Sequence, residues 1–152
     1  MSQKPKIALY EPDIPQNTAA IIRTCACLGA KLEIIEPCGF LLSDNRFKRV
    51  VMDYMKNTKI EFYKSSDNFF EEKKNQRIVL MTTKGSLSYT KFNFKTDDTI
   101  LFGRESAGVP NYVHKLIENR LKIPMKNNLR SLNIASSVAV VLAESLRQLK
   151  FL

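Results

Sequence analysis

The chain has 152 residues, and we expect residues 1–152 to form one domain with a substantial buried core. We expect no separate nucleic-acid-binding domain at this length. Its 24 Lys and Arg exceed its 15 Asp and Glu, which gives a formal net charge of +9. This excess favours a polyanionic partner, but a Lys-rich, solvated surface explains it about equally well.

The N-terminal segment does not have the apolar core of a signal peptide, because it reaches Glu11 and Asp13 before any long apolar stretch. The longest apolar run, residues 138–143, is much too short to span a bilayer. We therefore expect a cytoplasmic protein that is not embedded in a membrane.

Three cysteines, Cys25, Cys27 and Cys38, cannot all pair with one another, and their odd number suits a reducing compartment. A zinc site needs about four ligands in a compact spacing, whereas these thiols have only the distant His114 to join them. Cys25 and Cys27 also point to different sides of the helix on which we place them. We expect packing roles for the thiols and no metal.

Short β-type runs alternate with longer helical runs. In chain order, we expect a strand at 6–10, a helix at 17–28 that ends at Gly29, strands at 31–36, 60–63, 77–82 and 99–102, a helix at 112–118, a strand at 121–123 and a helix at 132–149. The polar stretch 84–98 is expected to be a loop within the domain. Apolar strands separated by helices predict an α/β fold with a mostly parallel sheet and helices on both faces.

The first distinctive segment, residues 15–23, opens the first helix. Arg23 is the only charged side chain between Asp13 and Lys31. Its isolation on an apolar helix suggests that this face meets an anion or another subunit, although an Arg that extends to solvent is an alternative. Asn17 lies at the expected start of the helix, where it can serve as the N-cap.

The second segment, residues 101–110, follows the strand at 99–102 and is bounded by Gly103 and Gly108. Loops at the carboxyl ends of buried strands are common ligand sites in α/β domains, and glycine lets the backbone approach a ligand. The segment is neither a Walker loop nor a G-x-G-x-x-G motif. A purely structural turn would explain both glycines but not Glu105.

The third segment combines residues 123–125 with residues 130–133 and leads into a helix without charge from 131 to 143. We expect this helix to be buried on nearly all sides. Ser131 and Asn133 then need hydrogen-bond partners, from helix capping or from a ligand. Ser131 as a simple N-cap is a strong alternative to a ligand role.

A fourth element, residues 44–49, is rich in basic side chains and is followed by Asp53 and Tyr54. Its cations and aromatic rings are suited to phosphate contacts and base stacking. The alternative is a solvated helix face with Phe47 directed inward.

The first three segments together resemble the SPOUT RNA methyltransferases, and the similarity extends across nearly the whole chain. It is greatest for the small members that methylate the 2′-hydroxyl of the tRNA wobble nucleotide. The resemblance implies a fold with a C-terminal deep trefoil knot, S-adenosyl-L-methionine as methyl donor, and a homodimer. It implies cytidine or modified uridine at position 34 as the target, with a leucine tRNA expected. A methyltransferase acting on ribosomal RNA and a noncatalytic RNA-binding protein on the same scaffold remain alternatives.

The resemblance also implies roles for individual residues. The implied catalytic set is Asn17, Arg23, Glu105, Ser131 and Asn133. Cofactor contacts are implied for Met81, Thr82, Gly103, Ile123, Met125, Ser131 and Leu132. RNA contacts are implied for Arg46, Lys48, Arg49, Tyr54 and Arg130.

A guanidinium normally keeps its proton, so we expect Arg23 to orient the ribose hydroxyl with assistance from Glu105. Two segments depart from the family pattern, and the contacts that they make are left open. These are the Thr18-Ala19-Ala20 run and Arg104.

Overall fold

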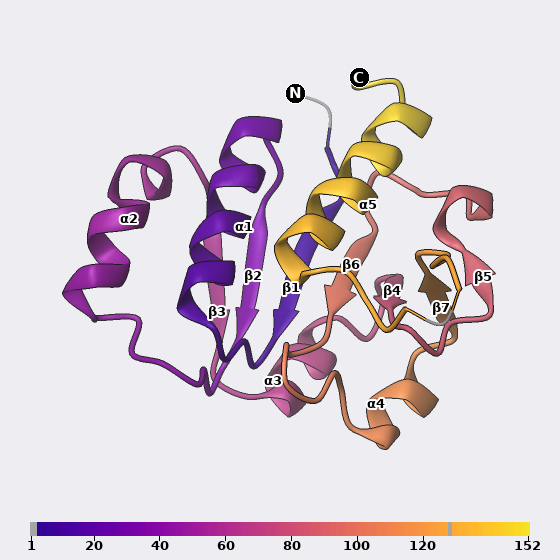
Figure 1. Ribbon diagram of the computed structural model, residues 1–152, viewed down its shortest axis with the longest axis horizontal. Helices are drawn as coiled ribbons and strands as arrows, with labels where there is room; N and C mark the ends of the chain where they lie inside the picture. Colours follow the sequence, from indigo (N-terminus) through magenta and orange to yellow (C-terminus); the bar gives the residue numbers. More distant parts are fainter. Residues whose placement is uncertain (1–2, 128) are drawn as a thin grey trace.

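Seven strands form one sheet through the middle of the molecule, seen in the computed structural model of residues 3–127 and 129–152 (Figure 1). Their order is β3-β2-β1-β6-β4-β7-β5, and every pairing between these strands is parallel. This confirms the predicted α/β class. The strands are β1 (Lys6–Tyr10), β2 (Leu32–Ile35), β3 (Ile60–Tyr63), β4 (Ile78–Met81), β5 (Leu87–Ser88), β6 (Thr99–Phe102) and β7 (Asn119–Lys122).

Helices cover both faces of the sheet. The helices are α1 (Pro15–Leu28), α2 (Asn45–Met55), α3 (Ser66–Glu72), α4 (Asn111–Leu116) and α5 (Ile134–Gln148), with a 3-10 turn η1 at Tyr89–Lys91. On one face α1 packs against both α2 and α5, and these helices share a core with Ile7 and Leu9 of β1. On the other face Phe69 of α3 and Val113 of α4 pack with Ala8. Alternate side chains of β1 therefore pack into two separate apolar layers, one on each face of the sheet.

Helix α1 begins two residues earlier than predicted. Its N-cap is Ile14, which makes no side-chain cap bond, and Pro15 occupies the first turn. Proline suits that position because its φ is already helical and its missing N–H would have no intrahelical partner. The expectation that Asn17 caps the helix is therefore wrong. Gly29 ends the helix with a φ of 73°, as predicted.

Helix α5 is capped by Asn133 and not by Ser131, which corrects the simple N-cap alternative. The Asn133 Oδ1 accepts hydrogen bonds from two backbone N–H groups of the first turn, at 2.8 and 3.3 Å. The expected burial on nearly all sides is also wrong for a single chain. Ser136 and Val140 are exposed, because they lie on the side of α5 that faces away from the sheet and from α1.

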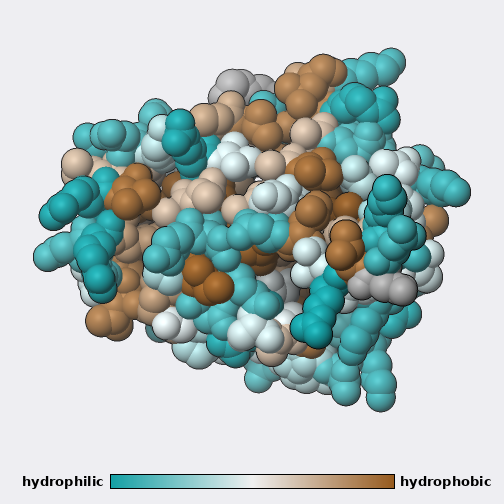
Figure 2. Space-filling view, in the orientation of Figure 1, coloured by the Kyte–Doolittle hydropathy of each residue, from teal (hydrophilic) through white to brown (hydrophobic). Residues whose placement is uncertain are grey.

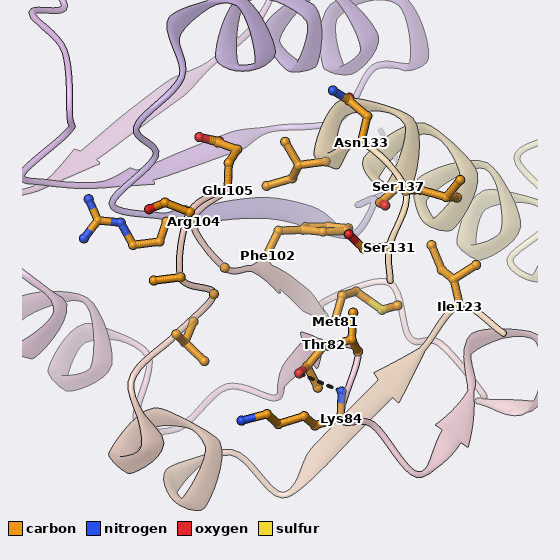
Figure 3. Close-up of a pocket in the computed structure, with 18 of the residues that line it drawn as sticks. Met81, Thr82, Lys84, Phe102, Arg104, Glu105, Ile123, Ser131, Asn133 and Ser137 are labelled. Atoms are coloured by element: carbon orange, nitrogen blue, oxygen red, sulfur yellow. Dashed lines mark hydrogen bonds between the residues drawn. The ribbon is translucent and has the colours of Figure 1, made fainter. Parts of the chain in front are cut away.

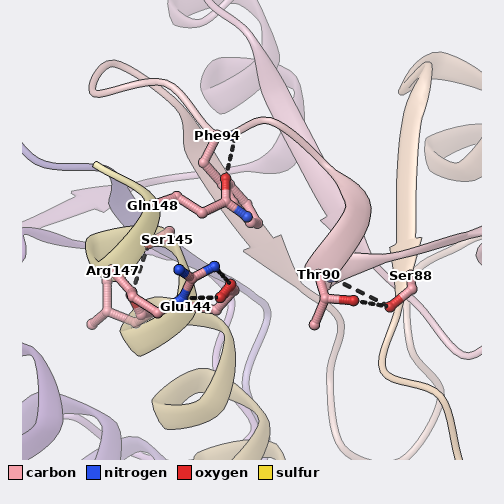
Figure 4. A network of polar contacts seen from close by, with 8 residues as sticks. Ser88, Thr90, Phe94, Glu144, Ser145, Arg147 and Gln148 are labelled. Atoms are coloured by element: carbon pink, nitrogen blue, oxygen red, sulfur yellow. Dashed lines mark hydrogen bonds and ion pairs between the residues drawn. The ribbon is translucent and has the colours of Figure 1, made fainter. Parts of the chain in front are cut away.

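The polar stretch 84–98 is more ordered than predicted, since it contains β5 and η1. Its far end is tied to α5, where the Gln148 Oε1 accepts a hydrogen bond of 3.1 Å from the Phe94 backbone N–H (Figure 4). Nearby on α5, Arg147 pairs with Glu144 at 2.7 Å. The stretch therefore forms the edge of the sheet and part of the support of α5.

Strand β7 lies between β4 and β5, which follow each other in the chain. The residues that join β4 to β5 pass over β7 at Gly85, which is buried against the backbone of Leu121. A Cβ at this position would overlap the Leu121 carbonyl, so the crossing needs glycine. The trefoil knot implied by the resemblance stays a prediction.

Two other expectations concern thiols and membranes. Burial of Cys25 raises the pKa of its thiol to about 12, which agrees with a packing role. Cys27 is exposed, so a packing role within this chain is wrong for it. In the described part of the chain, no helix is long and apolar enough to cross a bilayer.

Candidate active site

A pocket of about 660 Å³ opens at the carboxyl ends of β4, β6 and β7, between the loops that follow these strands and the first turns of α1 and α5 (Figure 3). This is the edge of a parallel sheet where ligands commonly bind. The volume falls in the range of about 300–1,000 Å³ that is typical of small-molecule sites.

The pocket collects most of the residues singled out from the sequence. Four of the five residues expected to be catalytic line it, and so do all seven residues expected to contact the cofactor. The former are Asn17, Glu105, Ser131 and Asn133, and the latter are Met81, Thr82, Gly103, Ile123, Met125, Ser131 and Leu132. Arg23 is not among the lining residues.

The loop after β4 forms one wall. The Thr82 Oγ1 accepts a hydrogen bond of 3.2 Å from the Lys84 backbone N–H, which turns the chain at the rim (Figure 3). Met81 and Phe102 are buried at the ends of β4 and β6 and make an apolar floor. Phe102 was not expected in the site, although its position at the end of a predicted strand could have indicated it.

The sequence also did not indicate His114, which lines the pocket from α4. Burial, with the positive charges of Lys84 and Arg120, lowers the pKa of its imidazole. His114 is therefore a neutral group at pH 7. Only the folded loop after β6 brings it to the wall, so its spacing in the sequence carries no signal.

The loop after β6 is closed by its own backbone. Arg104 and Gly108 exchange hydrogen bonds of 3.1 and 2.8 Å, and Gly108 has a φ of 65°. A Cβ at Gly103 would overlap the Gly108 backbone. Glycine is therefore required at position 103 by the loop itself, independently of any ligand.

Glu105 is turned away from the middle of the pocket, toward the segment before α1 (Figure 3). Its Oε2 accepts hydrogen bonds from the backbone N–H groups of Asp13 at 3.0 Å and Ile14 at 2.8 Å. Burial, followed by the neighbouring Asp13 carboxyl, raises the pKa of Glu105 to about 7. This geometry favours a positioning role over direct assistance to a substrate hydroxyl.

Arg23 lies in a second cavity, a groove of about 490 Å³ between α1 and α2. Its guanidinium carbon is 5.3 Å from the centre of the Tyr54 ring. Asn17 and Arg23 are six positions apart on α1, which corresponds to a rise of about 9 Å and a rotation of about 240° around the helix axis. Their side chains therefore project from different faces of α1. The spacing therefore does not bring both residues to one pocket in a single chain.

The basic run forms the start of α2, capped by the Asp44 Oδ1, which accepts from the Arg46 backbone N–H at 2.7 Å. Phe47 is buried, whereas Arg46, Lys48 and Arg49 are exposed. A buried Phe47 is thus compatible with exposed cations on the same helix. The phosphate-binding interpretation and the solvated-face interpretation both agree with α2. Arg130 is also exposed and lines neither cavity.

Comparison with known proteins identifies the family. Residues 4–143 match the model of the SpoU rRNA Methylase family. The chain belongs to the SpoU methylase family. A relative from Beijerinckia indica, named tRNA (cytidine(34)-2'-O)-methyltransferase, is 47% identical to this SpoU methylase over 144 residues, which cover 93% of this chain and 90% of the relative.

Two solved structures are similar to this chain. One, from work on the 2-OH methylation of C/U34 on tRNA, is 37% identical, with a TM-score of 0.93 and 99% of both chains covered. The SpoU methyltransferase AviRb from Streptomyces viridochromogenes, in complex with AdoMet, is 23% identical, with a TM-score of 0.86, 99% of this chain and 62% of that chain covered. The AviRb structure shows that AviRb and this chain share a fold. Together they confirm the predicted SPOUT fold class.

Proposed function

We propose that this SpoU methylase transfers a methyl group from S-adenosylmethionine to the ribose 2′-hydroxyl of nucleotide 34 in tRNA, with cytidine or uridine as the base. The observation that carries the proposal is the pocket at the ends of β4, β6 and β7, lined by every residue expected to contact the cofactor. The names of the relatives given above support the same reaction. They favour tRNA over the ribosomal RNA in the family's description.

The pocket suits S-adenosylmethionine in size and chemistry. When bound, this cofactor supplies a methyl group on a positively charged sulfur. Met81, Phe102 and Ile123 offer apolar surface for the adenine and exclude water. The turns at Thr82–Lys84 and Gly103 would hold the nucleoside through backbone groups, and Leu132 would cover it from the α5 side.

The side chains at the mouth of the pocket then align the ribose. Ser131 is exposed there and offers a hydroxyl, while the Asn133 Nδ2 donates a hydrogen bond of 3.0 Å to the Asn17 Oδ1 and orients that amide. Positioning two reactants in this way contributes several kcal/mol to lowering a barrier. We propose that the reaction needs no metal, because the donor already carries an activated methyl group.

We propose that the enzyme is a homodimer that pairs through the exposed faces of α1 and α5. Ala20 on α1 and Ser136 and Val140 on α5 are exposed and carry no charge. Figure 2 shows brown and pale surface across the upper middle of this face, interrupted by a few hydrophilic groups, with teal side chains dominating both ends. A second copy would cover this surface and bring Arg23, which lies outside its own pocket, toward the partner's site.

The exposed cations of α2 would contact tRNA phosphates, and the half-buried Tyr54 beside Arg23 would contact a base.

We place the reaction in the cytoplasm, in agreement with the free thiols of Cys25, Cys27 and Cys38. A leucine tRNA is the proposed substrate species.

Mass spectrometry of nucleosides from wild-type and deletion strains tests this function. We expect the 2′-O-methyl group at position 34 to be absent from leucine tRNA in the deletion strain and restored by the purified protein with S-adenosylmethionine and a chelator. Loss of a ribosomal methyl group instead would support the ribosomal alternative. No change in either RNA would support a noncatalytic RNA-binding protein.

A further inference from the structure

Two carboxyl groups meet where the loop after β1 contacts the loop after β6. The Asp13 Oδ2 accepts a hydrogen bond from the Ser106 hydroxyl and lies 3.7 Å from the Arg104 Nε. The Glu105 Oε2 accepts the backbone N–H groups of Asp13 and Ile14. In the described part of the chain, the other oxygen of each carboxyl, Asp13 Oδ1 and Glu105 Oε1, is buried and has no hydrogen-bond partner.

A single proton would satisfy both of these oxygens. Two ionised carboxylates repel each other because both are negatively charged. Neither can donate a hydrogen bond, so both buried oxygens would stay without a partner. A proton on Glu105 makes that carboxyl a donor to Asp13, whose backbone N–H already contacts the Glu105 carboxyl at 3.0 Å. Ser106 and Arg104 stabilise the ionised form of Asp13, which assigns the proton to Glu105.

We propose that Asp13 and Glu105 share one proton and act as a positioning pair that fixes the first turn of α1 against the wall of the pocket. The pair holds that turn through the backbone N–H groups of residues 13 and 14, and Asn17 lies on the same turn. Its effect on catalysis rests on the proposed function, whereas its effect on folding does not. Asp13 touches no substrate in this assignment and acts only through Glu105.

The charged and titratable groups around the pair come from three loops. Glu11 lies 3.8 Å from the Arg104 Nη1, and Glu36 and Cys38 approach from the loop after β2. Burial, then the charge of Glu36, raises the pKa of Cys38 to about 11, so this thiol stays neutral at pH 5–8. That loop packs closely here, because a Cβ on Gly39 would overlap Asp13.

The sign of the pH dependence follows from the two pKa directions. The pKa of Glu105 rises from 4.5 to about 7 on folding, chiefly through burial. Its contribution to stability is fully present below pH 4.5 and is lost as the pH rises toward 7. The pKa of Asp13 is lowered by its hydrogen bond with Glu105, so its contribution is lost only in more acidic solution. Between pH 5 and 8, the pair therefore makes the folded protein less stable as the pH rises.

Glu105→Gln tests the shared proton. The amide oxygen can accept the two backbone N–H groups, and the amide nitrogen can donate to the Asp13 Oδ1 at any pH. We expect the Tm of the wild type to fall by about 2–5 °C from pH 5 to pH 8. We expect the Tm of E105Q to lack this fall, and Glu105→Ala to have a lower Tm throughout. Glu72→Gln, on the exposed surface of α3, is the matched control and should keep the wild-type pH profile.

Infrared spectroscopy detects the proton directly. At pH 6 the wild type should show the band of a protonated carboxyl, and E105Q should not. Calorimetry should show that affinity for S-adenosylmethionine weakens from pH 6 to pH 8 more in the wild type than in E105Q. Absence of the band at pH 6, or a wild-type pH profile of the Tm in E105Q, overturns the shared proton. A protein that shows the band but never methylates tRNA would overturn only the proposed function.

Discussion

The side chains of Asn17 and Asn133, 116 positions apart, are joined by a hydrogen bond of 3.0 Å between their amides. Asn133 uses its Oδ1 to cap α5 and its Nδ2 to hold Asn17. One side chain thus fixes the beginning of the last helix and the first turn of α1 at the same time. The first turn of α1 and the start of α5 therefore meet at the mouth of the pocket through this contact.

Substitutions of Asn133 can separate its two tasks. Asn133→Ser keeps a capping oxygen but is too short to reach Asn17, whereas Asn133→Ala loses both contacts. We expect N133A to be less stable than N133S by about 1 kcal/mol, the usual value of an N-cap. Both should lower the single-turnover rate of methylation. Urea unfolding and single-turnover assays check this, and full activity of N133S would show that the amide bridge is not needed.

Arg23→Ala should lower the single-turnover rate by at least about 10²-fold, a typical cost of removing a charge-stabilising donor. Affinity for S-adenosylmethionine should stay nearly unchanged, because Arg23 lies outside the pocket of its own chain. Calorimetry and rapid-quench assays measure the two quantities. If folded, dimeric R23A methylates tRNA at close to the wild-type rate, Arg23 is a packing residue beside Tyr54.

Replacement of Arg46, Lys48 and Arg49 by Ala should weaken tRNA binding and make it less dependent on salt. Each lost phosphate contact removes about one unit from the slope of log affinity against log salt. Filter binding at several salt concentrations measures this slope.

The matched control for that variant removes three exposed lysines on the β3–α3 side, Lys59, Lys64 and Lys74. It loses the same charge and should keep a slope closer to that of the wild type. Equal effects of the two variants would mean that only the overall charge matters and that α2 is not a tRNA-binding surface.

Val140→Glu should split the homodimer, because it places a charge in the middle of the exposed face of α5. Sedimentation velocity at micromolar concentration should show a dimer for the wild type and a monomer for V140E, with loss of methylation. Leu116→Glu, at a more exposed position on α4 at the opposite face of the sheet, should remain dimeric. A wild-type monomer would contradict the proposed pairing.

Much of the sheet could be predicted from the sequence, because buried parallel strands have a strong local pattern. β1, β3 and β6 have the predicted bounds, and Gly29 ends α1 as expected. The edge of the sheet could not be predicted, since β5 has only two residues and exists because it pairs with β7. The strand expected at 121–123 lies at 119–122 for a similar reason, because its pairings with β4 and β5 set its ends.

The site was predictable where its parts follow strand ends, which meet at one edge of any parallel sheet. For this reason the loops that hold Met81, Gly103 and Ile123 converge as expected. The position of Arg23 depends on helix rotation and on packing against Tyr54, and the pairing of Asp13 with Glu105 depends on two distant loops. Neither relation leaves a local signal in the sequence.

The position of β7 constrains the order in which the chain can fold. It lies between β4 and β5, which are consecutive in the chain, and the segment that joins them crosses β7 at Gly85, where there is no room for a side chain. The turn at Thr82 is held there by a backbone hydrogen bond of 2.9 Å to the Leu121 carbonyl, so it cannot settle before β7 has entered. Such a late, non-local step slows folding. Molecules that have formed every helix but have not yet placed β7 beside β4 will lack the complete pocket, so we expect the ability to bind a nucleoside to appear late in refolding.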